Sequence, residues 1–545
     1  MLRSLDRYFW LIVSACMLCM TALQIGSMMQ ESSIFDEGIH LTSGYRYLRT
    51  GHFLLNPEHP PFQNVLNAAP VLLLNPPLPT DEKVSQDQLG YLTELLYRGP
   101  IHVDKLLFAA RLSSVALSAL LILVVAWATR RFFGAPAAIL AATLCSLDPN
   151  IIAHGRYVTT DISCTVFYLL TGTLWISYLR NPTKSTCAFA GLSLGLALVS
   201  KFSMVVLVPL LPILLIVHAM VTLVPFATLE RRILAIVFVY ITAVGVIAIV
   251  YLPDTMASLN TAIYDQIPAP VIPFFRYIAG IGVPLLHQKT GHASYLLGTL
   301  SSSGWWYYFP FVFAVKSPVG LLLLFSLAIW GAIRRLPRMI QERMEASTFV
   351  LMLLPALVYF SIVLISNINI GIRHILPIFP YLYVVCSAVL ARVLPEKKFL
   401  ATAGLLIALQ ATESLAIYPD YLAFFNFASG GPKAGPGYLL DSNLDWGQDL
   451  KKLKTYIDTN KPQTLCLDYF GFSDPKYYGV QSVELPKSWE KDKIKKMDCI
   501  AAISVTVLKG LYREPGSYDW LGDAKPFGMV GKSIYLYDFR MTKQR

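Results

Sequence analysis

Two adjacent carboxylates, Asp36 and Glu37, follow the first long apolar run of the chain. Because residues four apart share one face of a helix, His40 would lie beside Asp36. A carboxylate on a partly desolvated surface can take a proton from a hydroxyl group as a general base. For an isolated acidic pair, a solvated helix would be the simpler interpretation. Asp36 and Glu37 are therefore candidate catalytic residues, and His40 is a candidate supporting residue.

A rigid bend holds the next acidic residue of the same segment. Glu58 and His59 stand in the stretch Asn56–Pro61, where three prolines restrict the backbone and the last two can open a helix. A turn that merely leads into the next helix explains this stretch equally well. Glu58 with His59 or His287 could bind a divalent cation, but we do not predict a metal site. Isolated histidines such as His287 and His292 are more often surface residues.

Further charged residues stand near the ends of apolar runs, where long side chains can reach the membrane surface. Arg111 and Asp161 lie inside such runs, while Lys201, Lys316 and Arg373 lie between them. Interfacial anchoring explains each residue alone. Several fixed cations near one surface, however, are what a lipid phosphate needs. Lys201, Lys316 and Arg373 are thus candidate phosphate ligands, with Arg111 and Asp161 as supporting residues.

The composition is that of a membrane protein. Of the 545 residues, 55% are apolar and 14% are charged, whereas about 25% are charged in soluble proteins. These values exclude a disordered chain, a fibre and a water-soluble multidomain enzyme. The formal charge is +11, but the cations stand mostly in pairs between apolar runs, where they set membrane orientation. No nucleic acid partner is predicted.

About eleven apolar runs are predicted to form membrane-spanning helices. The first run could be a signal peptide with a lipoprotein-like cleavage box ending at Cys16, but it continues well past Cys16, which favours an uncleaved span. Two runs are short for a bilayer of roughly 30 Å and must rely on neighbouring protein. The predicted spans are 8–29, 106–129, 135–147, 158–179, 186–199, 203–225, 233–252, 317–333, 347–366, 375–394 and 399–417.

Short basic connections alternate with long polar ones along residues 1–417, the predicted transmembrane domain. The basic connections all fall on one side of the eleven spans, and the positive-inside rule places that side, with the N-terminus, in the cytoplasm. The segments 30–105 and 253–316 then face outward. The first of them is too long for a simple connector and is predicted to contain interfacial helices at 34–50 and 60–74.

Residues 418–545 predict a small outward-facing α/β domain, because Lys, Asp and Gly become frequent and the apolar runs shorten to strand length. Cys466 and Cys499 stand in two of the predicted strands. A disulfide is possible in an oxidising compartment, but two buried thiols are the favoured interpretation. The predicted elements are a helix at 448–457 and strands at 464–469, 499–507 and 533–538.

In their order and predicted side, these motifs together resemble the GT-C superfamily of integral-membrane glycosyltransferases. The likeness covers most of the chain and is greatest to the dolichyl-phosphate-mannose protein mannosyltransferases and the lipid A aminoarabinose transferases. Blocks in the last third look like those of bacterial members, which points to a bacterial plasma (inner) membrane with the C-terminal domain periplasmic or extracellular. The resemblance is carried by Asp36 and Glu37, Asn56–Pro61, Arg156, Thr160 and Asp161, Lys201, Gly371–His374, Tyr418–Asn426 and Asp441–Asp449.

The resemblance implies transfer of one sugar from a polyprenyl-phosphate carrier, of the dolichyl or undecaprenyl type, with inversion at the anomeric carbon. The catalytic carboxylate of the family falls on Asp36 as general base. Glu37 would support the acceptor or orient Asp36. Such a donor already carries a good leaving group, so the site needs only to stabilise the departing phosphate and deprotonate the attacking hydroxyl.

Other functional positions of the family can be matched to single residues of this chain. The second acidic position of the first outer loop falls on Glu58. His59 stands where the aminoarabinose transferases carry a lysine, which puts phosphate contact at this residue in doubt at neutral pH. Lys201 matches the cation of the family at that turn, and Asp161 matches its carboxylate at the outer end of a span.

A transporter or flippase of a lipid-linked glycan is the rival hypothesis. Transporters place polar residues near the membrane midplane, often in two repeated halves. This chain gathers them at one face and shows no repeat, which favours the enzyme. The sequence therefore predicts an all-α polytopic membrane protein with a small C-terminal α/β domain. Its expected partners are membrane lipid, a polyprenyl-phosphate-linked sugar and a protein, lipid or glycan acceptor, and neither the sugar nor the acceptor is identified.

Overall fold

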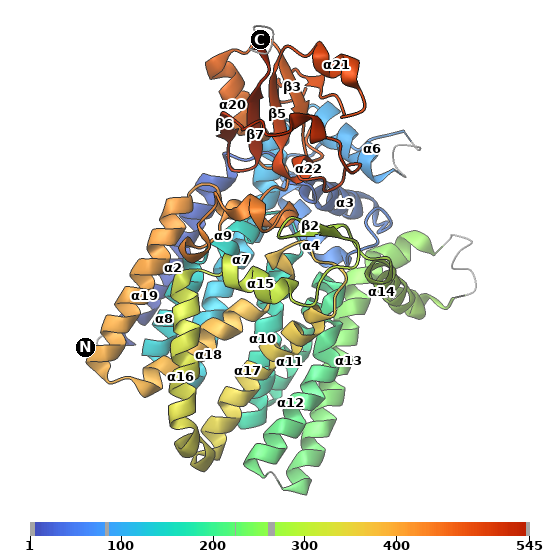
Figure 1. Ribbon diagram of the computed structural model, residues 1–545. Helices are drawn as coiled ribbons and strands as arrows, with labels where there is room; N and C mark the ends of the chain where they lie inside the picture. The colour runs from blue at the N-terminus through green and yellow to red at the C-terminus, as the bar shows by residue number, and fades with distance from the viewer. Residues whose placement is uncertain (1–5, 82–86, 224, 260–266, 541–545) are drawn as a thin grey trace.

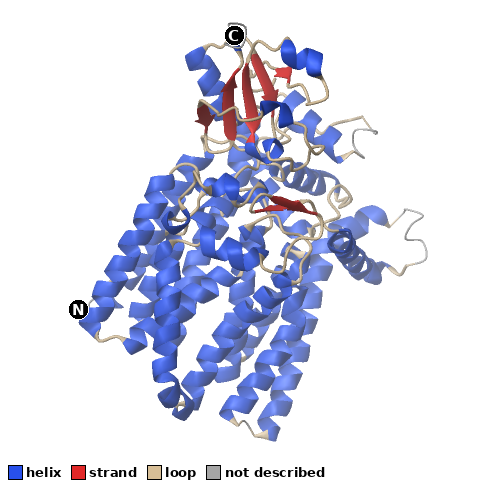
Figure 2. Cartoon of the chain, in the orientation of Figure 1, coloured by secondary structure: helices blue, strands red, loops and turns tan. Residues whose placement is uncertain are grey.

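The computed structural model describes residues 6–81, 87–223, 225–259 and 267–540. Figure 1 shows a bundle of long helices with a small domain at one end, and Figure 2 shows that the strands lie in this domain and in one hairpin. Within the described residues, eight helices are long and apolar enough to cross a membrane, or nine if one bent pair forms a broken span. The chain is therefore an integral membrane protein with multiple spans.

Each predicted span has a helix at its place. The short helices are α8 (Ala135–Ser146), α11 (Lys184–Ser200) and α18 (Ile378–Val393), and α16 (Val319–Gln341) is bent by 112° from the preceding α15 (Tyr308–Lys316). In α10 almost every side chain is buried, which is typical of a helix at the centre of a bundle. The long helices are α2 (Phe9–Met28), α7 (Val103–Phe133), α10 (Asp161–Arg180), α12 (Leu207–Thr222, after the 3-10 turn η3, Phe202–Val206), α13 (Phe226–Ser258), α17 (Arg343–Leu364) and α19 (Glu396–Ile417).

The structure adds one long helix, α14 (Ile272–Thr290), inside the segment 253–316 that the sequence predicts as an outer loop. Together with the 3-10 turn η4 (Ala269–Val271) it is long and apolar enough to count as a span, so the predicted number of spans is incomplete. Prolines stand in the first turns of both elements, where helices tolerate them. This proline-rich start hides the helix in the sequence. Figure 1 shows α14 beside the end of α13 that lies nearer the C-terminal domain.

Short helices lie between the bundle and the C-terminal domain (Figure 1). Gly51, in the left-handed conformation at φ 78°, ends the first of them, and Pro61 begins the second. The predicted helices at 34–50 and 60–74 are thereby confirmed. The short helices of this layer are α3 (Glu37–Thr50), α4 (Pro61–Ala68), η1 (Ala69–Leu73), α6 (Gln88–Thr93), η2 (Glu94–Arg98) and α9 (Pro149–His154).

Irregular segments and one hairpin complete this layer. The hairpin pairs β1 (Ser294–Leu296) with β2 (Thr299–Ser301), and its two turn residues, Leu297 and Gly298, both have positive φ, as a tight hairpin requires. The remaining 3-10 turns are η5 (Ile372–Ile375), η6 (Tyr421–Ala423), η7 (Phe427–Ser429), η8 (Gly435–Gly437) and η9 (Asp441–Asn443).

The C-terminal domain is built on a five-stranded mixed sheet in the order β4-β3-β5-β7-β6. β3 pairs in parallel with β4 and β5, while β7 pairs antiparallel with β5 and β6. The predicted strands are confirmed, except that the second ends early and continues as a short helix. The elements are α20 (Leu450–Asn460), β3 (Leu465–Asp468), β4 (Val483–Glu484), α21 (Lys491–Lys495), β5 (Ile500–Ser504), α22 (Val505–Leu508), η10 (Asp519–Leu521), β6 (Gly528–Val530) and β7 (Ile534–Asp538).

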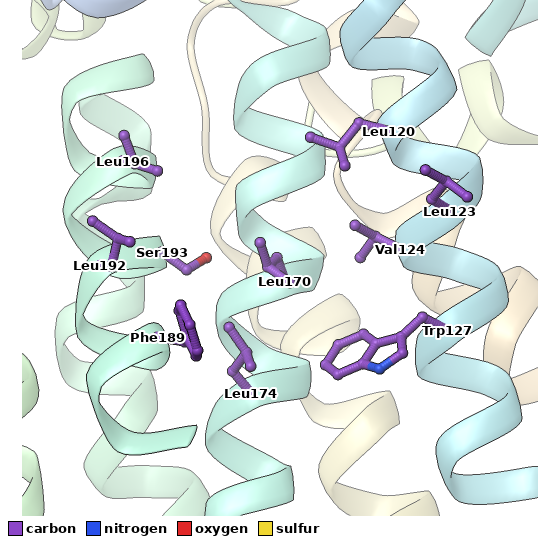
Figure 3. Close-up of a pocket in the computed structure, with 10 residues that line it drawn as sticks. All are labelled: Leu120, Leu123, Val124, Trp127, Leu170, Leu174, Phe189, Leu192, Ser193 and Leu196. Carbon is purple, nitrogen blue, oxygen red and sulfur yellow. The ribbon is translucent and has the colours of Figure 1, made fainter. Parts of the chain in front are cut away.

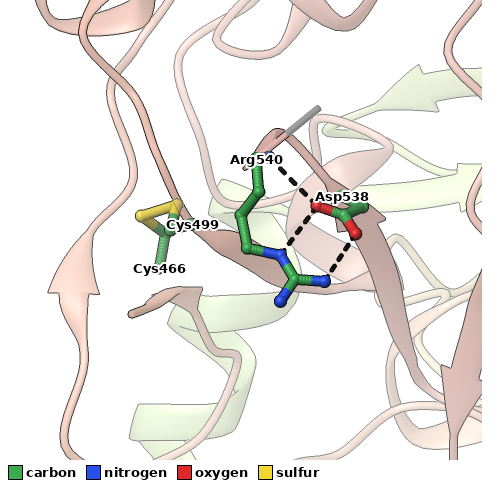
Figure 4. Close-up of a disulfide and its surroundings, with 4 residues drawn as sticks. All are labelled: Cys466, Cys499, Asp538 and Arg540. Atoms are coloured by element: carbon green, nitrogen blue, oxygen red, sulfur yellow. Dashed lines mark hydrogen bonds and ion pairs between the residues drawn. A yellow bond between two sulfur atoms is a disulfide. The ribbon is translucent and has the colours of Figure 1, made fainter. Parts of the chain in front are cut away.

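A disulfide joins Cys466 in β3 to Cys499 directly before β5 (Figure 4). The favoured prediction of two thiols is therefore wrong. The two strands are neighbours in the sheet, and their register brings the two Cα atoms to 5.9 Å, within the range that a disulfide spans. The order of strands in the sheet decides this distance, and the sequence alone does not give that order.

Candidate active site

Four alternating charges form an array at one end of the bundle. Nη1 of Arg373 donates to Oδ2 of Asp36 at 2.8 Å and lies 3.9 Å from Oδ2 of Asp161. Oδ1 of Asp161 accepts a hydrogen bond from Nζ of Lys201 at 2.6 Å. The side chains of Asp36, Lys201 and Arg373 keep exposures of 24%, 14% and 13%, whereas Asp161 keeps 1%. A ligand can therefore reach Asp36 and both cations, while Asp161 holds the two cations from behind.

Asp36 occupies the N-cap position of α3, yet its carboxylate forms no capping hydrogen bond with the helix. The carboxylate instead meets the guanidinium of Arg373. The positive end of the helix dipole favours a negative charge at this position. The helix therefore stabilises the Asp36 carboxylate without a hydrogen bond to its oxygens, and the partner of Oδ2 is Arg373.

A fully buried ion pair fixes the entry into α3. Glu37 accepts hydrogen bonds from Nε and Nη2 of Arg111 at 2.8 and 2.6 Å. It also accepts the backbone N–H groups of Ile34 and Val158, each at 3.0 Å. The side chains of Glu37 and Arg111 are both almost completely buried. Proteins tolerate buried charges when the charges are paired and fully hydrogen-bonded. This geometry suits a residue that positions the start of α3, and the catalytic role of Glu37 stays a prediction.

A second buried ion pair holds the chain just before Asp36. The guanidinium of Arg156 donates to Glu31 at 2.6 and 3.3 Å, and the hydroxyl of Tyr157 donates to the same carboxylate at 3.0 Å. Glu31 and Arg156 are both completely buried. The two ion pairs together tie residues 31–37 to α7 and to the turn between α9 and α10, so that Asp36 has a defined position.

Lys201 lies at a break between two helical segments. α11 ends at Ser200 and η3 begins at Phe202, and Lys201 between them has an extended backbone with φ −156° and ψ 134°. This break turns the lysine side chain toward Asp161. Burial lowers the pKa of Lys201, but the Asp161 carboxylate outweighs burial and raises the pKa above its ordinary value. Lys201 is therefore a fixed positive charge.

Arg373 is held by the irregular segment that enters the C-terminal domain. Its guanidinium lies 4.4 Å from the ring centre of Trp446, as in a cation–π contact. The N–H of Ile372 donates to Oδ1 of Asn443 at 3.0 Å, and the hydroxyl of Ser442 donates to the carbonyl of Ile370 at 2.6 Å. Burial lowers the pKa of Arg373, but the neighbouring carboxylates, first that of Asp36, raise the pKa above its ordinary value.

Three histidines surround the array in their neutral form. The rings of His40 and His59 lie 4.8 Å apart, and Nδ1 of His40 is 2.7 Å from Oδ1 of Asn64. Burial, followed by the charge of His40, lowers the pKa of His59 well below its ordinary value. Burial likewise lowers the pKa of His40 and of His374. His59 therefore adds no positive charge at neutral pH, and its role as a phosphate ligand stays a prediction.

Neither Lys316 nor Glu58 forms an ion pair with the array among the described contacts. Nζ of Lys316 is buried and donates to the backbone carbonyls of Leu422 (2.9 Å) and Asn443, over the ring of Phe425. Lys316 thus bonds to an irregular connection in this structure, and its role as a phosphate ligand stays a prediction. Glu58 is exposed to solvent. Among the described residues, no group of three or more His, Cys, Asp or Glu side chains is arranged to hold a metal ion.

The C-terminal domain contributes polar groups that the sequence analysis did not select for the site. The hydroxyl of Tyr512 donates to Oδ2 of Asp441 and lies 2.8 Å from Nε2 of His292, whose Nδ1 lies 3.0 Å from Nε2 of His287. Burial raises the pKa of Asp441 to about 6, although the hydrogen bond from Tyr512 and the charge of Arg373 lower it. The acidic stretch that contains Asp441 is visible in the sequence, but its partners are brought together only by the tertiary fold.

Two pockets lie among the described residues, one in the bundle and one at the β1–β2 hairpin. An apolar groove of about 360 Å³ opens between α7, α10 and α11, and its side chains are apolar except for Ser193 (Figure 3). A second pocket, of about 520 Å³, lies between the β1–β2 hairpin and residues 510–514, and Tyr512 lines it. Both volumes are in the range of small-molecule sites.

One known family matches part of the chain. Residues 101–254 match the family model of dolichyl-phosphate-mannose-protein mannosyltransferase. This segment contains Asp161 and Lys201, together with the three helices that line the apolar groove. No curated protein sequence matches the chain. The family match confirms, over this segment, the resemblance that the sequence motifs predict.

Several solved structures are similar to the chain over half of its length or more. ArnT from Cupriavidus metallidurans bound to undecaprenyl phosphate has 14% identity and a TM-score of 0.49, with 97% of each chain covered. The archaeal oligosaccharyltransferase AglB from Archaeoglobus fulgidus, with an inhibitory peptide and a dolichol-phosphate, has 14% identity and a TM-score of 0.49, with 88% of this chain and 60% of that chain covered. The protein O-mannosyltransferase complex Pmt1-Pmt2 of S. cerevisiae, bound to the sugar donor, has 16% identity and a TM-score of 0.28, with 51% and 32% covered.

Proposed function

We propose that this chain, which matches the mannosyltransferase family over residues 101–254, is an inverting glycosyltransferase. It would move a single sugar from a polyprenyl-phosphate carrier to an acceptor hydroxyl at the membrane surface. The observation that carries this proposal is the array of Asp36, Arg373, Asp161 and Lys201, in which two cations stand beside one reachable carboxylate. A phosphate-linked sugar needs both kinds of group in one place.

The two cations are placed to receive the donor phosphate. Arg373 offers a planar guanidinium and Lys201 a point charge, and both retain some exposure while Asp161 fixes them from behind. The apolar groove begins five residues before Lys201 on α11, at Leu196, which is about 7.5 Å along the helix axis. A lipid phosphate bound at the cations could therefore direct its apolar chain into the bundle.

Donor binding would also prepare the base. Without a ligand, the Arg373 guanidinium is bound to Asp36. A phosphate that takes over this guanidinium would release the Asp36 carboxylate at the moment when the substrate arrives. Asp36 then accepts the proton of the acceptor hydroxyl, whose oxygen forms a bond to the anomeric carbon. The bond between this carbon and the phosphate oxygen breaks, and the lipid phosphate leaves with the electron pair between Arg373 and Lys201.

We further propose that the array faces the outside of the cell. The basic pairs lie at the opposite ends of the helices, for example Arg130 and Arg131 at the end of α7 and Arg180 at the end of α10, and such residues are enriched in the cytoplasm. The disulfide between Cys466 and Cys499 also suits an oxidising compartment. Both features support a C-terminal domain that is periplasmic or extracellular, in a bacterial plasma membrane.

A transporter of a lipid-linked glycan is less well supported by this geometry. Asp36 and Lys201 adjoin the ends of α3 and α11, Asp161 begins α10, and Arg373 lies in the short turn η5. Transporters instead place such groups on broken helices near the midplane. The sugar and the class of acceptor, whether protein, lipid or glycan, stay open in this proposal.

A reconstitution experiment tests the proposal directly. The purified full chain in nanodiscs is given short-chain polyprenyl phosphates that carry different radiolabelled sugars, and loss of donor and release of polyprenyl phosphate are measured. We expect turnover of at least one donor, by transfer to an acceptor or slowly to water. In parallel, proteoliposomes loaded with the same lipids report movement between leaflets. Movement without any cleavage of the sugar–phosphate bond would overturn the enzyme and favour the transporter.

A further inference from the structure

Two non-glycine residues with positive φ are hydrogen-bonded to each other beside the array. Asp441 has φ 58° and Tyr512 has φ 62°, and the hydroxyl of Tyr512 donates to the carboxylate of Asp441. Such backbone conformations cost free energy for residues with a Cβ and persist only where the surroundings enforce them. Local turns account for other residues of this kind, for example Leu223 and Lys461 at helix C-caps and Leu297 in the hairpin.

The segment that begins with Asp441 holds Arg373 from two sides. Trp446 stacks on the guanidinium at 4.4 Å. Ser442 and Asn443 bind the backbone of residues 370 and 372, immediately before Arg373. The negative charge of Asp441 also acts on Arg373. Any shift of this segment would therefore move the guanidinium that meets Asp36.

The C-terminal domain in turn holds this segment. The N–H of Thr506 in α22 donates to Oδ2 of Asp445 at 3.1 Å. Tyr512 binds Asp441 through its hydroxyl and stacks against Phe470 with ring centres 5.2 Å apart. The same hydroxyl contacts His292, from the segment before β1. Tyr512 is thus a point where the domain, the outer segment 291–304 and the array are connected.

We infer that Tyr512 is a positioning residue through which the C-terminal domain keeps Arg373 available for the donor phosphate. The Tyr512 hydroxyl donates a hydrogen bond to the buried Asp441 carboxylate. Without this bond, the carboxylate would turn to Arg373 and compete with the phosphate. This inference rests on the proposed function and assigns the C-terminal domain a part in it. It also makes Tyr512 responsive to whatever occupies the pocket of about 520 Å³ that its side chain lines.

A matched pair of variants tests the inference. Tyr518 lies in the same domain and also donates its hydroxyl to a buried carboxylate, that of Asp468, which is bound by Arg513 and Lys487. Tyr512→Phe and Tyr518→Phe therefore remove the same group from the same kind of bond. For the full chain in nanodiscs, we expect Tyr512→Phe to raise the donor KM roughly tenfold, with a smaller effect on kcat. Tyr518→Phe should leave both constants unchanged, with a similar loss in Tm.

A double variant separates competition by Asp441 from general damage. In Tyr512→Phe with Asp441→Asn, the unpaired carboxylate is gone, so the donor KM should return toward the wild-type value. Failure of the double variant to restore the KM, or equal KM values for Tyr512→Phe and Tyr518→Phe, would overturn the inference. If the wild-type protein cleaves no donor at all, the proposed function fails instead, which keeps the two outcomes distinct.

Discussion

Arg373 donates a hydrogen bond to Asp36 at 2.8 Å, although the two residues are 337 positions apart in the chain. Both side chains are partly exposed, and the Asp36 carboxylate forms no capping hydrogen bond with α3. One partner carries the negative charge that a base needs, and the other carries the positive charge that a phosphate needs. In the proposed function, the pair is therefore a resting state in which each group blocks the other until a charged donor competes for the guanidinium.

Replacement of the base should stop the reaction without preventing donor binding. Asp36→Asn retains an oxygen that can accept from Arg373, but it can no longer take up a proton. We expect transfer to fall roughly 100- to 10,000-fold, while donor affinity stays the same or improves. Donor turnover and equilibrium binding of a labelled polyprenyl phosphate measure the two effects. The control is Glu94→Gln, an exposed carboxylate of the same outer segment that pairs with Arg98. Turnover by Asp36→Asn at the control rate would remove Asp36 from the role of base.

Loss of Lys201 should weaken donor binding in two ways. Lys201→Met removes one phosphate ligand and leaves Asp161 without its 2.6 Å partner. Asp161 then attracts Arg373 more strongly and draws it away from the phosphate. We expect the donor KM to rise roughly 10- to 100-fold, since hydrogen bonds to charged groups are the strong ones. Lys184→Met, at an exposed position at the other end of α11, is the control. An unchanged donor KM in Lys201→Met would exclude Lys201 as a phosphate ligand.

Glu37 should matter for stability rather than for chemistry. Glu37→Gln leaves the buried Arg111 guanidinium without its counter-charge, which should lower the free energy of unfolding by about 3–5 kcal/mol. Replacement of both partners, as Glu37→Leu with Arg111→Met, should cost less, because no buried charge then stands alone. Thermal unfolding in detergent measures both. A Glu37→Gln protein that is as stable as wild type but inactive would return Glu37 to the catalytic candidates.

The sequence predicts the helices of the bundle well because each is a long apolar run, and it predicts Asp36, Lys201 and Arg373 because cations and carboxylates stand out among apolar residues. It cannot decide between adjacent or similar residues. The side chains of Asp36 and Glu37 point in different directions at the start of α3. The buried Arg111 pairs with Glu37 and so decides which of the two carboxylates faces the array. Lys316, like Lys201, stands at a helix break, but its amino group turns to backbone carbonyls.

The contributions of the C-terminal domain have a different cause. His292, Asp441 and Tyr512 meet only through contacts between segments that are 71 and 220 residues apart. No local periodicity encodes such contacts. The disulfide is missed for the same reason, because it depends on the order of strands in the sheet.

Acid should destabilise the folded protein through histidines that are buried in their neutral form. His154, at the end of α9, is an example: burial, the first cause, lowers its pKa to about 3, whereas an unfolded histidine titrates near 6.5. Between these values the unfolded chain binds more protons than the folded chain, so stability is lost as the pH falls below about 6.5. The loss is about 1.4 kcal/mol per pH unit for one such residue.

A histidine variant isolates this contribution. His154→Asn should flatten the decline of Tm between pH 6.5 and 5, because the residue that must remain neutral is gone. The control is His102→Asn, at an exposed cap of α7 where asparagine can also accept the hydrogen bond from the N–H of Asp104. It should leave the slope as in the wild type. His59 and His374 carry shifts in the same direction, so a slope should persist in His154→Asn. A slope equal to that of the wild type would mean that His154 is protonated, or reaches water, in the folded protein.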